Sequence, residues 1–346
     1  MGKDNFQYNI AKLSLTEKIN FFSEFHSYLG SSIPLTTALN NMQTYSNNPK
    51  IKRIAINLLS EIDKGENFAS AILKFKNTIG NVYCNLMSIG AQSGELPEIL
   101  KDIHTSLKKQ RTTLYNLIRA SVYPAILIIM LIGASLLLLF FVAPRLAEQY
   151  QNVSGEDLPQ TLALMQRLGD IIGGNIFFII LVFALVIYGF VRFFKHLLKS
   201  ELGVKFPVIG AVIRYYNLST FSKLLAIAYA AGMPITHGIL LSSEPIQNEF
   251  IQKKLFKCST YIQKHSLADS FAGTGFFTPQ MLSKLQAGEQ TGRLDEVLHE
   301  ISSEIDETLE TVIGSALQML EPLLMIIIAV FLTIFGSAMM RSIFML

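Results

Sequence analysis

The side chains best placed to do chemistry in this sequence are carboxylates that precede an apolar segment near its end. Glu300, Glu304 and Glu307 are spaced i, i+4 and i+7, so a helix would present all three on one face. Hard divalent cations bind several carboxylate oxygens, and this stripe could contribute to such a site. One helix alone rarely supplies enough ligands, so a solvated helix face is the simpler interpretation and we predict no metal site.

Motifs for other kinds of chemistry are absent from the sequence. There is no Gly-x-x-x-x-Gly-Lys-[Ser/Thr] loop to hold nucleotide phosphates and no Gly-x-Ser-x-Gly turn to expose a serine nucleophile. The 6 histidines lack the spacing of metal ligands. We therefore predict no catalytic residue and no cofactor, and the energy for any work has to come from a partner.

The segments that position these carboxylates occur twice in the chain. Residues 90–100 match residues 288–298, and six of the eleven positions are identical, among them Gly94 with Gly292. Two pairs of prolines repeat in nearly the same register: Pro34 with Pro234, and Pro124 with Pro322. Several anchors at offsets of 198 to 200 residues indicate an internal duplication.

Each copy begins with a polar segment whose pattern is helical. Ile51, Ile54 and Leu58 repeat at helical spacing, and no alternating strand pattern is bounded by turn signals. Gly94 and Gly292, one in each copy of the motif, are predicted to end helices, because glycine adopts a positive φ without strain. Pro34 and Pro234 are predicted to begin helices. The polar segments therefore read as two small helical bundles.

Three apolar runs are each about as long as a helix that crosses a bilayer, roughly 20 residues. The predicted organisation is an N-terminal segment (1–15), a first cytoplasmic bundle (16–119), a first transmembrane helix (120–143), an external loop (144–170), a second transmembrane helix (171–194), a cytoplasmic connector (195–216), a second cytoplasmic bundle (217–320) and a third transmembrane helix (321–343). The fold class predicted is an all-α membrane protein with two homologous bundles and three spans in a lipid bilayer.

The charges around these runs predict how the chain is oriented. Basic residues gather before the first run and after the second: Lys101, Lys108, Lys109, Arg111, Arg119, and Arg192, Lys195, Lys199, Lys205, Arg214. Cytoplasmic flanks carry such an excess, so both bundles and the N-terminus are expected inside and the C-terminus outside. No apolar run begins the chain, and no cleaved signal peptide is expected.

The two copies differ in charge just before their apolar runs. Lys108 and Lys109 align with Asp306 and Glu307 at the 198-residue offset. Unrelated solvated faces are the simpler interpretation. The alternative hypothesis is that these equivalent helices dock, within one chain or between neighbours, with opposite charges that fix the partner.

The repeated Gly-x-Gln-[Ser/Thr]-Gly-x-Leu-x-Glu-x-Leu motif, with Tyr123-Pro124 in the first run, resembles the type II secretion F family. The resemblance covers nearly the whole chain. It implies a non-catalytic platform protein of the inner membrane in type II secretion, type IV pilus or competence machines. One departure is Ala91, where the family motif usually has the glutamate that the second copy keeps as Glu289.

The resemblance also implies partners: a cytoplasmic hexameric assembly ATPase, pilin or pseudopilin subunits, other inner-membrane components of the machine, and further copies of the chain, with no nucleic acid bound directly. The exposed turns at Gly94 and Gly292 are candidates for touching the ATPase. Glu321, at the edge of the third run, is expected to face water or to meet the positive N-terminus of an arriving pilin-like subunit. The alternative function is a small transporter or channel subunit, but the runs carry no buried charge to mark a path.

Overall fold

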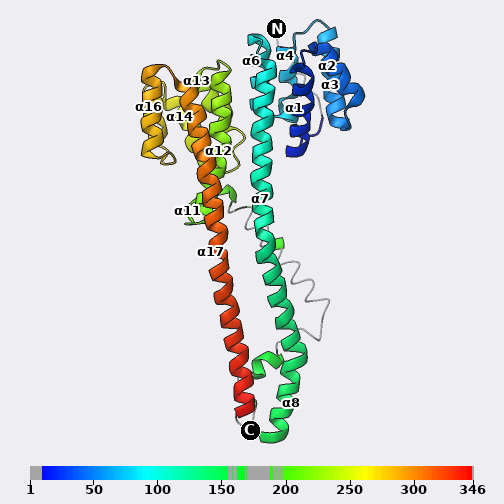
Figure 1. Cartoon of the computed structure of the whole chain (residues 1–346), viewed down its shortest axis with the longest axis vertical. Coiled ribbons are helices and arrows are strands. Elements are labelled where there is room, and N and C mark those ends of the chain that lie inside the picture. The colour runs from blue at the N-terminus through cyan, green and yellow to red at the C-terminus, as the bar shows by residue number, and fades with distance from the viewer. Residues whose placement is uncertain are drawn as a thin grey trace. The chain divides into compact units, whose positions relative to one another are not determined.

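The computed structural model describes residues 10–154 and 198–344, together with 158, 162–167, 169, 188, 189, 192 and 196. All regular secondary structure in these described residues is helical, which confirms the predicted all-α class (Figure 1). The chain forms two units by its contacts. Unit 1 consists of residues 1–115 and 198–312, and unit 2 consists of residues 116–197 and 313–346.

The first half of unit 1 is a bundle around a core rich in phenylalanine. Its helices are α1 (Leu15–Leu29), α2 (Leu35–Tyr45), α3 (Pro49–Asp63), α4 (Phe68–Ile72), α5 (Lys76–Ile79), α6 (Asn81–Ser93) and the first turns of α7 (Leu96–Leu137). Phe21, Phe22 and Phe25 of α1 are fully buried in this core. Each buried phenylalanine contributes roughly 2 kcal/mol from the apolar surface that it removes from water.

The second half of unit 1 is also a bundle of helices. Its helices are α11 (Glu201–Lys205), α12 (Ile209–Ala230), α13 (Ile235–Ser243), α14 (Glu249–Tyr261), α15 (Leu267–Ala272), α16 (Pro279–Thr291) and the first turns of α17 (Leu294–Phe344). Phe221, Leu255 and Phe271 are buried at its centre. Helix α12 begins inside the predicted connector, and its residue Ile213 already belongs to this core.

The repeated motif serves the same purpose in both halves. Gly94 ends α6 and Gly292 ends α16, each in the left-handed conformation, with φ of 83° and 71°. A Cβ on Gly90 would lie 2.6 Å from Ile99, and a Cβ on Gly288 would lie 2.9 Å from Val297. The first glycine therefore lets a helix pack closely on the next one, and the second lets the chain reverse between them.

The helix N-termini also repeat across the two halves. Asn48 and Asn248 are the N-caps of α3 and α14, and each side chain accepts a hydrogen bond from a backbone N–H of the first turn. Pro34 and Pro234 lie at the N-caps of α2 and α13, one position before the first helical residue. Both prolines thus stand at helix starts, as the sequence predicts.

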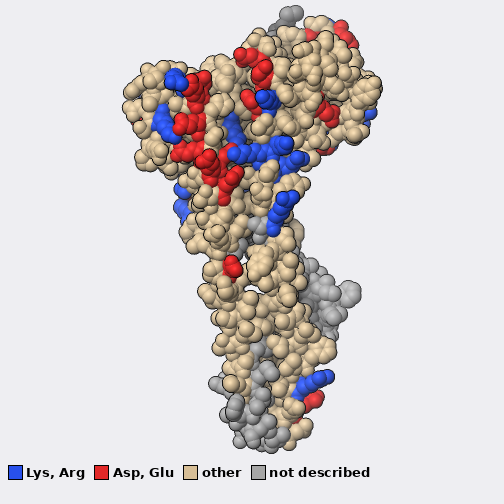
Figure 2. Space-filling view, viewed as in Figure 1, with Lys and Arg blue, Asp and Glu red and all other residues tan. Residues whose placement is uncertain are grey.

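Unit 2 contains the long apolar parts of α7 and α17. These are the two helices, among the described residues, that are long and apolar enough to cross a membrane. Their apolar side chains are exposed in the structure, for example Ile126 and Ile129 on α7 and Ile326 and Val330 on α17. The core helix of a soluble protein would bury such residues. Figure 2 shows few charged side chains over these parts.

The helix that contains the first apolar run continues past residue 143, into the segment predicted to be external. It passes through a π turn (Leu138–Val142) into α8 (Ala143–Ser154). Pro144 is the second residue of α8, two positions after the end of this turn. A proline inside a helix has no N–H to donate and its ring crowds the carbonyl four residues earlier, which the wider π turn accommodates. Tyr150 of α8 packs with Leu162, and residues 162–167 are helical.

The predicted second span, residues 171–194, lies almost entirely outside the described residues. Pro124 lies inside α7, and Pro322 lies inside α17. Neither proline ends its helix. Each polar bundle of unit 1 is therefore continuous, through one helix, with one apolar segment of unit 2.

Candidate interface between the two bundles

A buried carboxylate joins the two bundles of unit 1. Asp306 of α17 is 4% exposed. Its Oδ2 lies 2.9 Å from Nζ of Lys109 on α7, and its Oδ1 lies 2.8 Å from Nζ of Lys223 on α12. The hydroxyl of Ser219, also on α12, donates to Oδ1 at 2.5 Å. One helix of the first bundle and two helices of the second thus meet at a single side chain.

This arrangement satisfies the needs of a buried charge. A carboxylate taken out of water is tolerated when it is paired and its lone pairs accept hydrogen bonds. The side chain of Lys223 is 13% exposed, whereas that of Lys109 is 44% exposed. Burial lowers the pKa of the Lys223 ammonium, and the hydrogen bond and charge of Asp306 oppose that shift. Lys223 is therefore the partner that depends on Asp306 most.

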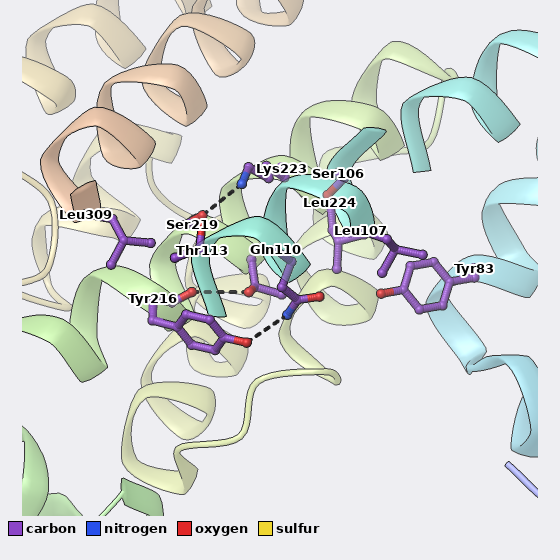
Figure 3. Close-up of a pocket in the computed structure, with 11 residues that line it drawn as sticks. Tyr83, Ser106, Leu107, Gln110, Thr113, Tyr216, Ser219, Lys223, Leu224 and Leu309 are labelled. Atoms are coloured by element: carbon purple, nitrogen blue, oxygen red, sulfur yellow. Dashed lines mark hydrogen bonds between the residues drawn. The ribbon is translucent and has the colours of Figure 1, made fainter. Parts of the chain in front are cut away.

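A small cavity lies beside this ion-pair cluster (Figure 3). It measures about 10 Å³, roughly the space of one water molecule. Gln110 of α7 points across it and donates to the hydroxyl of Tyr216 on α12 at 3.1 Å. Burial raises the pKa of Tyr216, so its hydroxyl stays protonated. The contact between the bundles is polar as well as apolar here.

Two further features mark the same contact. Nδ2 of Asn81 on α6 lies 2.7 and 2.9 Å from the carboxylate oxygens of Glu244, which follows α13. An open cleft of 240 Å³ is lined by Asp102, His299 and the Asp306 cluster. Burial raises the pKa of Asp102, and the charge of His299 opposes that shift. Polar interfaces of this kind permit relative motion of the parts that they join.

The structure separates the four aligned charges into one ion pair, Lys109 with the buried Asp306, and two exposed residues without an ion pair. Lys109 and Asp306 lie together, as the docking hypothesis requires within one chain. Lys108 and Glu307 are exposed, and neither has an ion-pair partner within 4 Å among the described residues. The role of all four in assembly stays a prediction.

The acidic stripe on α17 is partly paired within the second bundle. Nζ of Lys284 on α16 lies 2.7 Å from Glu300 and 3.1 Å from Glu304. Glu307, the third carboxylate, is exposed. In the part of the chain that the structure describes, no three His, Cys, Asp or Glu side chains are grouped to hold a metal ion.

The motif glutamate of the second copy has a structural partner. Oε1 of Glu289 accepts a hydrogen bond from the backbone N–H of Leu267, the first residue of α15, at 2.7 Å. In the first copy Ala91 lies at the matching position and lines an open groove with Phe68, the first residue of α4. Ala91 has no carboxylate to accept an N–H at the start of α4, which keeps Asn67 as its N-cap.

Sequence reasoning missed Lys223 and Ser219, which complete the Asp306 cluster. A signal was present, because Lys223 is the one charge in the otherwise uncharged segment 215–243. A charged residue within an apolar helix has to find a partner when that helix is buried.

Cys84 and Cys258 are both buried and free, and burial raises the pKa of the Cys84 thiol to about 12.

A comparison with models of protein families shows the family of this chain. The model of the family described as type II secretion system protein F matches residues 21–144 and 221–340. The chain belongs to this family. Each matched stretch contains one copy of the glycine motif and one of the apolar helices that follow it.

Relatives of this F-family chain come from both secretion and pilus systems. The type II secretion system protein F of Aeromonas hydrophila is 24% identical over 87% of the chain and 79% of the relative. The type IV pilus assembly protein PilC of Pseudomonas aeruginosa is 22% identical over 94% of the chain and 88% of the relative. The protein transport protein HofC homolog of Haemophilus influenzae is 25% identical over 99% and 87%. The family and the exposed apolar helices indicate an inner-membrane component of such machinery.

Proposed function

We propose that this F-family protein is a non-catalytic platform that couples a cytoplasmic assembly ATPase to the polymerisation of pilin-like subunits. The observation that carries the proposal is the continuity of α7 and α17. Each begins in a polar bundle and continues without a break into an apolar segment. Such a helix is a direct mechanical link between a cytoplasmic partner and subunits held in the membrane.

The two halves of unit 1 support an origin by duplication, with one bundle and one span in each copy. The shared glycine turns, the asparagine caps and the two stretches matched by the family model favour this interpretation. In this proposal both bundles face the cytoplasm, where the ATPase docks. Between the two copies, the proposed second span at 171–194 returns the chain to the cytoplasm.

The orientation is tested by labelling single cysteines in intact cells. Cys84 and Cys258 are first replaced by serine, and one cysteine is then placed at Gln92 in the first bundle or at Gln149 in α8. A membrane-impermeant maleimide should label Gln149→Cys in intact cells and label Gln92→Cys only after the inner membrane is opened. The reverse pattern would refute a cytoplasmic first bundle.

The coupling is tested in cells that lack the chromosomal gene. Wild-type protein should restore fibre assembly or secretion and should copurify with the assembly ATPase. A variant that lacks residues 217–293 of the second bundle, with α17 retained, should insert into the membrane and fail in both assays. Restoration of assembly without any association with the ATPase would contradict the coupling role.

A further inference from the structure

A short segment before the second bundle, residues 198–206, exposes several large apolar side chains. Leu202 of α11 is 63% exposed, and Phe206, the C-cap of this helix, is 50% exposed. Leu198, which precedes α11, is exposed as well. Single apolar side chains on a surface need no explanation, whereas several that gather in one place mark an interaction site.

The other side of this segment is fixed to the second bundle. Val204 packs against the bundle core. Nδ2 of Asn248, a buried residue, donates to the backbone carbonyls of Leu198 and Ser200, each at 3.0 Å. A Cβ on Gly210 would lie 2.2 Å from the carbonyl oxygen of Val204, so α12 approaches α11 closely at a residue without a side chain. The apolar side chains are therefore presented by a backbone that the bundle holds in place.

Basic residues accompany the apolar side chains. Lys199 and Lys205 are exposed. Lys205 forms an ion pair with Glu201 at 3.0 Å, whereas Lys199 has no ion-pair partner within 4 Å among the described residues. Glu201 is the one acidic residue of the sequence between positions 192 and 216. Exposed apolar side chains combined with basic ones are typical of segments that lie in the surface of an anionic membrane.

The segment lies at the end of unit 1 from which α17 continues into its apolar part. Ser219 of α12 donates to Asp306 of α17, and Tyr216 and Leu309 line the same cavity (Figure 3). The two helices therefore run antiparallel, so the start of α12 lies toward the later turns of α17. Figure 1 shows α11 beside that start of α12.

The chain length also limits the distance between this segment and a membrane. Leu198 is four residues after the proposed second span, residues 171–194. Four extended residues reach at most about 14 Å. The headgroup region on each side of the hydrocarbon core is about 5–8 Å deep. The segment thus begins within reach of the lipid headgroups.

We propose that residues 198–206 form an interfacial segment, in which Leu198, Leu202 and Phe206 insert among the headgroups of the cytoplasmic membrane surface. Lys199 binds anionic headgroups there, and Lys205 contributes less because Glu201 neutralises it. The inference rests on the membrane insertion of the proposed function. Because the segment is fixed to the bundle, this contact holds the second bundle at the membrane surface.

The experiment uses tryptophan fluorescence, because the chain contains no tryptophan of its own. Leu202→Trp and Phe206→Trp are made separately in the full-length protein and reconstituted into vesicles of phosphatidylethanolamine and phosphatidylglycerol with brominated acyl chains. Phe256→Trp is the matched control, since Phe256 lies on α14 of the same bundle and is 47% exposed. Bromine quenches tryptophan on contact, so both test variants should be quenched at least about threefold more strongly than the control.

Ile129→Trp, in the apolar part of α7, separates this test from the test of membrane insertion. Quenching of Ile129→Trp without quenching of the two test variants above the control would overturn the interfacial segment and leave insertion standing. No quenching of Ile129→Trp would refute insertion itself. Equal quenching of Phe256→Trp and Phe206→Trp would overturn a contact confined to residues 198–206.

The role of charge is tested by adding Lys199→Glu to Phe206→Trp. This change should reduce the quenching in brominated vesicles that contain phosphatidylglycerol, because the carboxylate is repelled by anionic headgroups. It should leave the quenching unchanged in brominated vesicles of phosphatidylcholine alone, which carry no net charge. The same loss in both kinds of vesicle, or in neither, would contradict the binding of anionic headgroups by Lys199.

Discussion

At the scale of single residues, the two halves of the chain offer matched positions that differ by one side chain. Ser32 has a φ of 59°, and it is the one non-glycine residue with a positive φ among the residues described. Its counterpart in the second half is Gly232, with a φ of 80°. The same turn before α2 and α13 is therefore strained in one copy and relaxed in the other.

Exchange of these residues should change stability in opposite directions. A left-handed conformation costs a residue with a Cβ about 1–2 kcal/mol, and glycine costs about 0.5–1 kcal/mol in the unfolded chain. Ser32→Gly should therefore raise the free energy of unfolding by up to about 1 kcal/mol, and Gly232→Ser should lower it by a similar amount. Thermal unfolding of the full chain in detergent measures both. The same sign for both variants would contradict the comparison.

Within the ion-pair cluster, loss of Asp306 should cost more stability than loss of Lys109. Asp306→Asn leaves Lys223 buried without its counter-charge, and breaking a buried pair costs about 3 kcal/mol. Lys109→Gln should cost less than about 1 kcal/mol, since Lys109 is half-exposed. Chemical denaturation of the full chain in detergent, followed by circular dichroism, compares the two variants. Equal losses would show that Lys223 does not depend on Asp306.

The loss in Asp306→Asn should shrink as the pH rises. The pKa of Lys223 in the folded protein is below its ordinary value of 10.5, and removal of Asp306 takes away the hydrogen bond and the charge that do most to raise it. Between the folded pKa and 10.5 the unfolded chain binds more protons, so stability increases with pH in that window. Stability of the variant relative to wild type, measured at about pH 7 and about pH 9, should therefore improve at the higher pH.

At the scale of elements, helix ends explain the repeated motif. The glycine at each helix end reverses the chain, and the glycine four residues earlier lets the next helix approach. Glu289 adds a carboxylate at the first N–H of α15, close to the N-cap Ser266. Because Ala91 replaces this glutamate in the first half, the motif can lose that cap and still form the turn.

Removal and restoration of this carboxylate form a matched test. Glu289→Ala should destabilise the second bundle by about 1 kcal/mol, because a hydrogen bond from a backbone N–H to a charged group is lost. Ala91→Glu should stabilise the first bundle by up to about 1 kcal/mol, since it restores a partner for the start of α4. Hydrogen exchange at residues 67–72 and 266–272 reports each bundle separately. A decrease in protection at 67–72 in Ala91→Glu would refute the equivalence.

At the scale of the whole molecule, two long helices connect polar bundles to apolar segments. Glu321 of α17 lies in unit 2, one residue before Pro322, and its side chain is exposed. No charge follows it in α17 until Arg341. A carboxylate at the start of an apolar run either faces the water at the membrane edge or meets a positively charged group of an arriving subunit.

These two roles predict different results for Glu321→Gln. In the platform function that we propose, the variant should reach normal levels in the membrane and lose at least tenfold in fibre assembly, because it no longer attracts the N-terminal charge of a pilin-like subunit. Glu321→Asp, which keeps the charge, is the matched control. Normal assembly by Glu321→Gln would leave Glu321 as a boundary residue facing water.

The sequence by itself determined the features that depend on short spacing along the chain. The helices, the glycine turns, the proline helix starts and two of the apolar helices follow from local conformational preference and hydrophobic periodicity. The repeated glycine motif was visible because the sequence can be compared with itself. The continuation of the first apolar helix through α8 was missed, because a π turn that accommodates Pro144 has no signal of its own in the residues.

Only the tertiary structure decided which charges are buried. Asp306 and Glu307 are neighbours with the same chemistry, yet one lies among Ser219, Lys223 and Lys109 and the other is exposed. The spacing of apolar residues along α17 shows which side of this helix faces its own bundle. Which further side meets α7 of the first bundle depends on Lys109, 197 positions before Asp306, and the free energy of that contact comes from surfaces that exist only after both bundles have folded.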